Sequence, residues 1–399
     1  VTTSLDIKEN SYKIKYLLNK YKNTYRHRRR ANFDLGQFFE RTLYIFNRTQ
    51  RFGDFLHSVD LSECVSGFDG RNTSQYIKSH ILNGLLLHHD VPDFHWDEYK
   101  SVYNKNYAST HHETAALAQW QKNLRLVAEH NKLYLAGKHS YSLHLNHLGD
   151  LHALDYFKKL LKLKITIPLL DPARDHFRAA YHANRHRYAP EHVDWRSRGF
   201  KPRLEEQLQC GACYAFTVTH AIQAQLFKKH GDWNELSPQQ IVDCSYKDGN
   251  MGCEGGSLSA TLRYVAREGL TMETSYPYIG KKESCHYNPW LARTRPSRWA
   301  VLPTRDERAM EKAVAHIGPL AVAVNAAPFT FQLYRNGIYD DLFCTPWTVN
   351  HAMLLVGYTP EYWILLNWWG RNWGEDGYIR IRRGMNRCGI SNTPIYVEL

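Results

Sequence analysis

Two cysteines separated by two residues begin the stretch of this sequence best suited to covalent chemistry. Cys210 and Cys213 lie in the segment Cys-Gly-Ala-Cys-Tyr, and an apolar run that predicts a buried helix extends from Cys213 to Gly231. The N–H groups and dipole at the start of a helix favour an anion, so a thiol at Cys213 becomes a nucleophilic thiolate more easily. The same pair could also be a redox dithiol or half of a zinc site.

A nucleophilic thiol needs a base and a group that orients the base, and two downstream residues fit these roles. His351 lies 138 residues after Cys213, at the head of an apolar strand, and Asn367 lies 154 residues after it, at the end of the next strand. An imidazole there can take the thiol proton and return it to a leaving amine. A zinc site would need further Cys or His ligands at matching spacing, and a redox pair would need a βαβ context.

Cysteine usage and charge restrict the compartment and the partners that the protein can have. Seven of the eight cysteines lie after Ala189, which suits an oxidising compartment with six paired cysteines and one odd thiol, and the eighth is Cys64. The net charge is +12, but +10 of it falls before Ala189, so we expect no nucleic-acid partner. No run reaches 18 apolar residues, so we expect no membrane span.

The elements that must position these residues form a helical half followed by a strand half. A helix over 213–230 is followed by a shorter one, with Ser237 as N-cap and Pro238 in its first position, and four strand-like segments follow Pro319. This order predicts an α+β fold with a cleft between the halves. Upstream, apolar stripes from Phe94 predict two amphipathic helices, then a strand within 141–150 and an exposed connector at 185–195.

Five motifs, in order, resemble those of papain-like cysteine peptidases, and of cathepsin L-like proenzymes in particular. They are the segments 207–216, 252–256, His351, 367–370 and 373–374. The resemblance implies a papain-like two-lobed fold, with a helical left lobe, a β-barrel-like right lobe and a cleft between them. Upstream, Trp120, Asn123, Val127 and Asn131 resemble the helix of the family's inhibitory propeptide, and residues 146–150 resemble its short strand.

The resemblance divides the chain into an N-terminal extension that is part of an accessory domain (1–90), an inhibitory propeptide (91–188) and a peptidase domain (189–399). This layout is closest to the arthropod 26/29 kDa cysteine proteinase group. It implies the proenzyme of a cysteine endopeptidase that hydrolyses peptide bonds through a thioester and is activated by removal of the propeptide, with cleavage near 185–191. The alternative is a catalytically impaired peptidase-like scaffold that binds a partner through its cleft.

The resemblance also assigns roles. Cys213 would be the nucleophile, His351 the base and Asn367 the residue that holds its ring, while Gln207 and the Cys213 N–H would form the oxyanion hole. Substrate would contact Gly255, Gly256, Ser257, Leu258, Ala323, Val349, Ala352, Thr393 and Trp369, and the uncharged lining implies an apolar residue at P2. The implied disulfides are Cys210–Cys253, Cys244–Cys285 and Cys344–Cys388, and Asn47 and Asn72 are candidate glycan acceptors. Three departures stand beside the site: Tyr214 for a common Trp, which the pattern tolerates, Trp368 for a usual Ser and Leu208 for a usual Gly.

No cofactor and no metal are expected. The expected partners are protein and peptide substrates and the chain's own propeptide, bound in cis as an inhibitor in a lysosomal or secreted monomer. Segment 94–188 holds 11 histidines, including His111, His112, His144 and His147, so acid should charge it and weaken its docking. Protonation of Asp150 and nearby carboxylates is the competing trigger.

Overall fold

The computed structural model describes residues 96–165, 188–231 and 235–399, so Asn47, Cys64 and Asn72 lie outside the described residues. The chain divides into two compact units, residues 1–105 and 106–399. The described part of the first unit, residues 96–105, contains the helix α5 (Trp96–Val102), in which Tyr99 is buried. The elements below belong to the second unit. In the described residues, no helix combines the length and the apolar character needed to cross a membrane.

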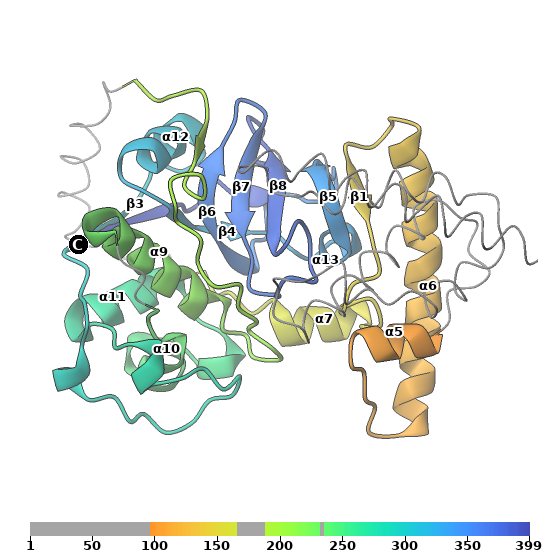
Figure 1. Ribbon diagram of the computed structural model, residues 1–399, viewed down its shortest axis with the longest axis horizontal. Coiled ribbons are helices and arrows are strands. Elements are labelled where there is room, and N and C mark those ends of the chain that lie inside the picture. The colour runs from red at the N-terminus through yellow and green to blue at the C-terminus, as the bar shows by residue number, and fades with distance from the viewer. Residues whose placement is uncertain (1–95, 166–187, 232–234) are drawn as a thin grey trace, which may run out of the picture. The chain divides into compact units, whose positions relative to one another are not determined.

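The helical half of the second unit is built around α9 (Cys213–His230). This helix is buried from Cys213 to Leu226 and ends at Gly231, whose φ of 67° is a conformation that glycine adopts easily. It packs against α10 (Pro238–Cys244), α11 (Leu258–Glu268) and the sheet, as Figure 1 shows. Ser237 and Ser257 cap α10 and α11 by accepting backbone N–H groups. Short 3₁₀ turns follow these helices: η2 (Tyr246–Asp248), η3 (Gly252–Glu254), η4 (Glu273–Ser275) and η5 (Pro289–Leu291).

The strand half is one twisted sheet that also takes in β1 (Tyr141–Leu143) of the upstream segment. Its order is β1-β5-β8-β7-β6-β4-β9-β3, and β2 (Val193–Asp194) pairs separately with β6. Its strands are β3 (Arg298–Val301), β4 (Leu320–Val324), β5 (Tyr334–Tyr339), β6 (His351–Tyr358), β7 (Tyr362–Leu366), β8 (Tyr378–Arg382) and β9 (Ile395–Glu398). Strands β4 and β6 are buried along their whole length, so they form the centre of the core. Helix α12 (Glu307–His316) packs on them, α13 (Phe329–Gln332) precedes β5, and η6 (Arg387–Gly389) precedes β9. The predicted α+β fold is confirmed.

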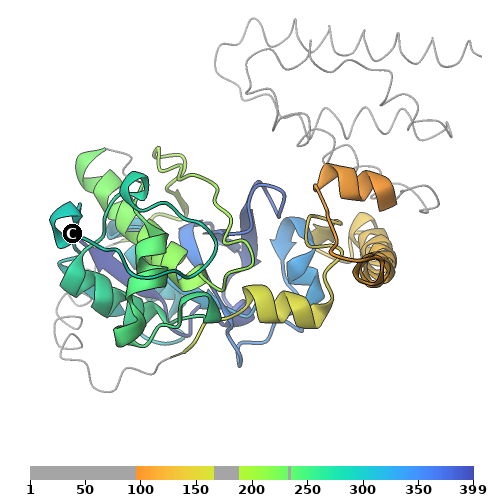
Figure 2. The same cartoon turned by 90° about the horizontal axis from the view of Figure 1, so that it is seen from below.

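The upstream segment joins this sheet through a short strand. It contains α6 (Thr110–Leu135), β1 (Tyr141–Leu143) and α7 (Ala153–Leu160). The Asn131 amide on α6 donates to the Leu143 carbonyl and accepts the Leu143 N–H, each at 2.9 Å, so the helix fixes β1. Strand β1 then pairs antiparallel with β5. A Cβ on Gly337 would lie 2.4 Å from the Ser140 carbonyl oxygen, so this approach requires glycine. In Figure 2, α6 lies beside these strands and α7 extends toward the helical half.

Two expectations about the upstream segment need correction. The predicted strand within 141–150 is only three residues long, because Asn146 ends it by accepting the Leu148 N–H and donating to the Gln332 carbonyl. The predicted exposed connector ends at His192, since Val193–Asp194 forms β2 and Trp195 is buried with its indole N–H on the Val314 carbonyl. Residues 185–187 lie outside the described residues.

Candidate active site

The sulfur of Cys213 lies where helix α9 meets strand β6. Cys213 is fully buried and, among the described cysteines, is the one outside a disulfide. It is the first residue of α9, and the backbone N–H of Ala352 is directed at its sulfur. Ala352 follows His351 at the start of β6, so the packing of α9 on β6 brings the cysteine and the histidine into one site.

The ring of His351 is held by Asn367. Its Nε2 lies 2.7 Å from Oδ1 of Asn367, and that oxygen also accepts the Trp368 backbone N–H at 2.8 Å. Because an amide oxygen can only accept, Nε2 carries the proton. The buried Nδ1 of His351 has no hydrogen-bond partner among the described residues, so it is the nitrogen left to accept a proton. The Trp369 ring packs 4.8 Å from the imidazole and is 2% exposed, which shields the contact from water.

Burial controls the charge of both groups. It raises the pKa of Cys213 to about 12, although the backbone N–H groups of Ala352 and Tyr214 oppose the shift. Burial also lowers the pKa of His351 to about 4, against the opposing effect of the Asn367 bond. Thiol and imidazole are therefore both neutral while the site is covered, and the thiolate–imidazolium pair is expected of an uncovered site.

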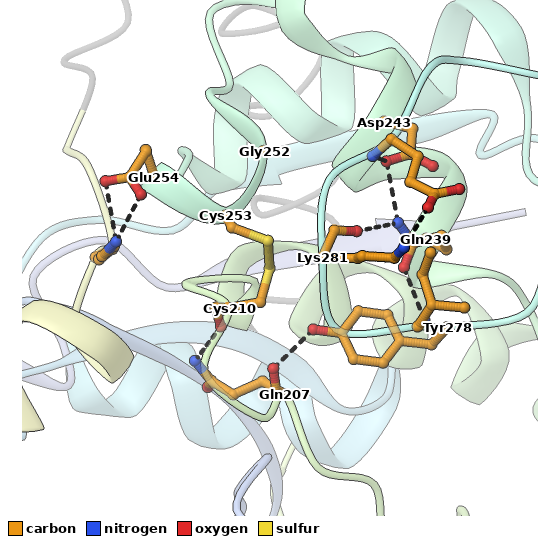
Figure 3. The surroundings of a disulfide bond; sticks show 12 residues. Gln207, Cys210, Gln239, Asp243, Gly252, Cys253, Glu254, Tyr278 and Lys281 are labelled. Atoms are coloured by element: carbon orange, nitrogen blue, oxygen red, sulfur yellow. Dashed lines mark hydrogen bonds and ion pairs between the residues drawn. A yellow bond between two sulfur atoms is a disulfide. The ribbon is translucent and has the colours of Figure 1, made fainter. Parts of the chain in front are cut away.

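The side chain of Gln207 is fixed in front of α9. Its Nε2 donates to the Cys210 carbonyl at 2.8 Å and to the Leu160 carbonyl of α7 at 3.3 Å. The backbone is held from both sides, since the Gln207 N–H donates to the Trp368 carbonyl and the Tyr278 hydroxyl donates to the Gln207 carbonyl (Figure 3). A carbonyl oxygen of the upstream segment thus occupies a donor that could otherwise stabilise an oxyanion.

Three disulfides fix the loops around the cleft: Cys210–Cys253, Cys244–Cys285 and Cys344–Cys388. These are the pairs that the resemblance implies. The first one, drawn in Figure 3, joins the loop before α9 to the loop around η3. The Gly211 N–H adds a bond of 2.9 Å to the Cys253 carbonyl, so the two loops form one rigid side of the cleft.

Residues 160–164 of the upstream segment lie across this cleft. Leu163 forms a parallel bridge with Gly256, and the Lys164 N–H donates to the Gly256 carbonyl at 2.8 Å. On the other side, the Leu163 N–H donates to the Asn350 carbonyl at 3.1 Å. A Cβ on Gly255 would lie 1.9 Å from the Lys162 carbonyl oxygen. The segment 160–164, which we call the strap, therefore connects the helical half to the strand half directly over the site.

The other expected substrate contacts come from three parts of the chain. Ser257 and Leu258 follow Gly256 at the start of α11. Ala323 and Ala352 are partners across β4 and β6, and Thr393 lies two residues before Ile395, the partner of Ala321. Val349 lines a groove of about 860 Å³ together with the strap residues Leu161 and Leu163. No charged side chain belongs to this set of six.

Trp368 and Leu208, which depart from the usual family residues, leave the reacting groups in place. The Trp368 side chain is fully buried behind the site, where its indole N–H lies 3.0 Å from both Thr217 Oγ1 and the Ala352 carbonyl. Its ring therefore fills the space between α9 and β6 rather than the cleft. Leu208 has a φ of 54°, in the region that favours glycine, and its side chain is 53% exposed.

A buried contact between a histidine and a carboxylate behind Trp368 was not predicted from the sequence. His220 of α9 is 1% exposed, and its Nε2 lies 3.1 Å from a carboxylate oxygen of Glu205. Its Nδ1 lies 3.0 Å from the Phe216 carbonyl, so both ring nitrogens face oxygen atoms. The ring lies 4.5 Å from Trp368. The one signal in the sequence was a histidine within a buried apolar helix.

Comparison with known proteins matches two families to separate parts of the chain. Residues 189–398 match the papain family cysteine protease model, and residues 96–156 match the cathepsin propeptide inhibitor domain. Cathepsin S of Bos taurus is 37% identical over 314 residues, which are 77% of this chain and 93% of that protein. Cathepsin S of Mus musculus is 38% identical over 315 residues, which are 77% of this chain and 91% of that protein.

Solved structures agree with this match. The chain resembles the digestive procathepsin L2 proteinase of the Tenebrio molitor larval midgut with a TM-score of 0.70 and 32% identity, over 76% of this chain and 98% of that one. Digestive procathepsin L 3 of the same larvae gives a TM-score of 0.68 at 31% identity, with the same coverage of both chains. The chain therefore belongs to the papain family of cysteine proteases, as a cathepsin L-like proenzyme that carries its propeptide inhibitor domain.

Proposed function

We propose that Cys213, His351, Asn367 and Gln207 perform the peptide-bond hydrolysis of this cysteine endopeptidase. The observation that carries the assignment is the 2.7 Å contact between His351 and Asn367, which leaves Nδ1 of the imidazole without a partner among the described residues, while the N–H of the next residue, Ala352, is directed at the Cys213 sulfur. The position of Cys213 at the start of α9 adds to it, because the helix terminus stabilises a thiolate.

The roles follow from this geometry. His351 takes the thiol proton at Nδ1, and the sulfur adds to the carbonyl carbon of the scissile bond. Gln207 Nε2 and the Cys213 N–H stabilise the resulting oxyanion. When the C–N bond breaks, the leaving amine takes the proton from His351 and the acyl group remains on sulfur as a thioester. Water, deprotonated by His351, then releases the acid and restores the thiol.

We infer that the cleft prefers an apolar residue at P2. Its lining is the uncharged set of Ser257, Leu258, Ala323, Val349, Ala352 and Thr393. A leucine of the strap supports this pocket, because Leu163 bridges Gly256 and is 8% exposed. Burying such a side chain contributes about 1.5–3 kcal/mol, whereas an arginine would leave a buried charge without a partner. A peptide library in which Arg at P2 is cleaved faster than Leu would contradict the pocket.

The strap explains inhibition, because it places its residues in the reverse of the productive order. In a substrate, the residue in the P2 pocket precedes the carbonyl at the oxyanion donors. In the strap, Leu163 at Gly256 follows Leu160, whose carbonyl lies at Gln207. We therefore infer that segment 91–188 inhibits in cis and is removed by cleavage near 185–191. Tyr188 is 80% exposed, and exposed segments of this kind are cut most easily.

We further infer that the enzyme is a monomer of a lysosomal or secreted compartment, with residues 1–90 as an N-terminal accessory segment of the 26/29 kDa type. Among the described cysteines, three disulfides beside one unpaired thiol suit an oxidising compartment. Residues 189–399 form the peptidase domain in this layout.

Acid incubation of the purified full chain tests the assignment. N-terminal sequencing of the product locates the cleavage, and a peptide assay follows the activity that appears. Cys213→Ala should abolish turnover, and Asn367→Ala should lower kcat more than it raises KM. A Cys213→Ala protein that cleaves as fast as the wild type would refute the mechanism. An impaired binding scaffold predicts no labelling of Cys213 by an epoxysuccinyl inhibitor, whereas the proposed enzyme is labelled irreversibly.

A further inference from the structure

A buried histidine of α9 packs against the tryptophan that follows the catalytic asparagine. The His220 ring lies 4.5 Å from the Trp368 ring. Both of its nitrogens are held, because Nε2 lies 3.1 Å from a carboxylate oxygen of Glu205 and Nδ1 lies 3.0 Å from the Phe216 carbonyl. The face that this ring presents to Trp368 is therefore fixed, and His220 reaches the catalytic residues through Trp368 rather than by direct contact.

The backbone of Trp368 is bonded to two residues of the catalytic assignment. Its N–H donates to Oδ1 of Asn367 at 2.8 Å, and the same oxygen faces Nε2 of His351. Its carbonyl accepts the Gln207 N–H at 2.9 Å. A rotation of residue 368 would therefore change both the orientation of the asparagine amide and the position of the oxyanion donor.

The indole of Trp368 adds bonds to the two elements that carry the nucleophile and the base. Its Nε1 lies 3.0 Å from Thr217 Oγ1, on α9 about one turn after Cys213, and 3.0 Å from the Ala352 carbonyl on β6. The Ala352 N–H is directed at the Cys213 sulfur. The orientation of this one ring is therefore coupled to α9, to β6 and, through the backbone of residue 368, to the asparagine and the oxyanion donor.

Glu205 connects the histidine to the loop that carries the oxyanion donor. It lies two residues before Gln207, and its backbone carbonyl accepts the Gly370 N–H at 3.1 Å. Glu205 thus binds the segment after Trp368 with its backbone and His220 with its side chain. Since both ends of the segment 368–370 are bonded to the loop before α9, a displaced histidine would disturb the loop and the segment together.

We propose that the contact of His220 with Glu205, which we call the brace, positions Trp368 for catalysis. The proposal rests on the catalytic assignment above and adds two positioning residues to it. Through the bonds of Trp368, the brace keeps the Asn367 amide against the imidazole and the Gln207 donor in the oxyanion loop. The serine that is usual at position 368 is too short to meet the His220 ring, so the brace belongs to the departure in this chain.

Replacing the histidine tests the brace in the full chain after acid processing. With a peptide that has leucine at P2, we expect His220→Ala to lower kcat about 3- to 10-fold, while KM changes by less than about twofold. The alkaline limb of kcat/KM should move to lower pH, because the Asn367 oxygen favours the charged imidazole and a loosened asparagine favours it less. Titration of Cys213 with an epoxysuccinyl inhibitor counts the folded enzyme, so that a loss of folded protein does not enter kcat.

Two variants of the carboxylate test the other half of the brace. Glu205→Ala should have the same effects as His220→Ala. Glu205→Gln should keep most of the activity, since an amide can either donate to a ring nitrogen or accept from it. This rescue by the conservative variant separates the contact with the ring from the mere presence of a side chain.

Gln225→Ala is the matched control on the same helix. Gln225 is also buried, and its amide donates to the Ile317 carbonyl at 3.1 Å, toward the end of α9 away from Cys213. We expect this variant to lower Tm by an amount comparable to His220→Ala, but to leave kcat and the pH profile unchanged.

A double variant decides whether the histidine acts through the tryptophan. In a Trp368→Ser background, His220→Ala should lower kcat by less than about twofold, since the ring that it positions is gone. Full additivity of the two effects overturns the proposal, as does a His220→Ala enzyme with the kcat and pH profile of the wild type. A wild-type enzyme without Cys213-dependent hydrolysis would instead refute the catalytic assignment, so the two failures are distinguishable.

Discussion

Two of the regions in which the described part of the propeptide touches the peptidase domain differ in their chemistry. The docking region, where β1 joins β5, is buried and consists of backbone pairing and neutral side chains, including the Ser140 carbonyl on the Ile338 N–H at 2.8 Å. The strap over the cleft is held by a few backbone bonds and by the exposed pair of Lys162 and Glu254. Groups in the docking region would be left buried and unsatisfied if their partners were lost, whereas the exposed ion pair contributes little.

Because of this difference, the contacts that give the propeptide its affinity are not the contacts that block the active site. The docking region holds the propeptide but lies away from the sulfur, and the strap covers the sulfur but is weakly held. Disturbing the docking region should therefore release the inhibitor, whereas disturbing side chains of the strap should change the rate only slightly.

The largest effect is expected at the sulfur that the strap covers. Burial raises the pKa of Cys213 to about 12 in the proenzyme, and removing the strap should lower this pKa and raise that of His351. At pH 6, we expect iodoacetamide to alkylate Cys213 at least about 100-fold faster after processing, because the thiolate is the reactive form. Mass spectrometry of the peptide that contains residue 213 measures the rate, and Cys213→Ala reports any labelling at Cys64. Equal rates before and after processing would mean that the strap does not protect the thiol.

The next effect is expected in the docking region, at Asn131. Asn131→Ala removes both bonds to Leu143, and each unsatisfied buried group costs about 1–3 kcal/mol. We expect activity to appear at neutral pH about tenfold faster or more. The exposed Arg125 lies on the same helix, so Arg125→Ala is the control and should behave as the wild type. If both variants activate alike, α6 does not hold the inhibitor through β1.

A smaller effect is expected from pH. Burial lowers the pKa of His130 to about 4, and its ring stacks 4.3 Å from His139 with Nε2 on the Tyr141 carbonyl. Since the pKa in the unfolded segment is about 6.5, the contribution of the neutral His130 ring to the folded propeptide is fully present above pH 6.5 and is lost as the pH falls toward 4. His130→Gln keeps a donor without the charge, so the midpoint pH of processing should fall by about half a unit.

The four histidines that the sequence suggested as the acid trigger provide the comparison for His130→Gln. His111 and His112 are exposed on the first turn of α6, whereas His144 is buried with its Nε2 on the Asn372 carbonyl. A variant in which His111, His112, His144 and His147 are all Gln tests the original expectation. If neither variant changes the midpoint, protonation of carboxylates such as Asp150 is the trigger.

The smallest effect is expected in the strap. Lys162→Ala removes the contact with Glu254, and an exposed ion pair is worth about 0.2–1 kcal/mol. Activation at pH 5 should be about 2- to 5-fold faster, with the difference reduced at high salt. Lys122→Ala, which removes an exposed charge from α6, should have no effect. A tenfold change or more for Lys162→Ala would mean that the strap contributes much of the affinity.

The sequence predicted the elements whose signals are local. Residues 213–230 form the predicted helix, and Ser237 with Pro238 begins the next, because an apolar run, a cap and a terminal glycine act within one element. The grouping of Cys213, His351 and Asn367 was expected from motif order. The sequence could not predict the Glu205–His220 pair or the strap contact with Glu254, since these join residues whose proximity arises from tertiary packing. The predicted connector extended past His192, where the structure ends it, because the alternation of Val193 and Trp195 is too short to signal a strand.

The pairing of β1 with β5 has a consequence for the processed enzyme. When the propeptide leaves, β5 becomes the last strand of the sheet, and the Ile338 N–H and the Leu333 carbonyl lose Ser140 and His144 as partners. A strand edge with unpaired backbone groups can add an extended segment of another chain. The positive φ of Gly337, 97°, interrupts the regular edge and limits how long such a pairing can become. Activation thus opens an attachment edge where β1 was paired, as well as an active site where the strap lay.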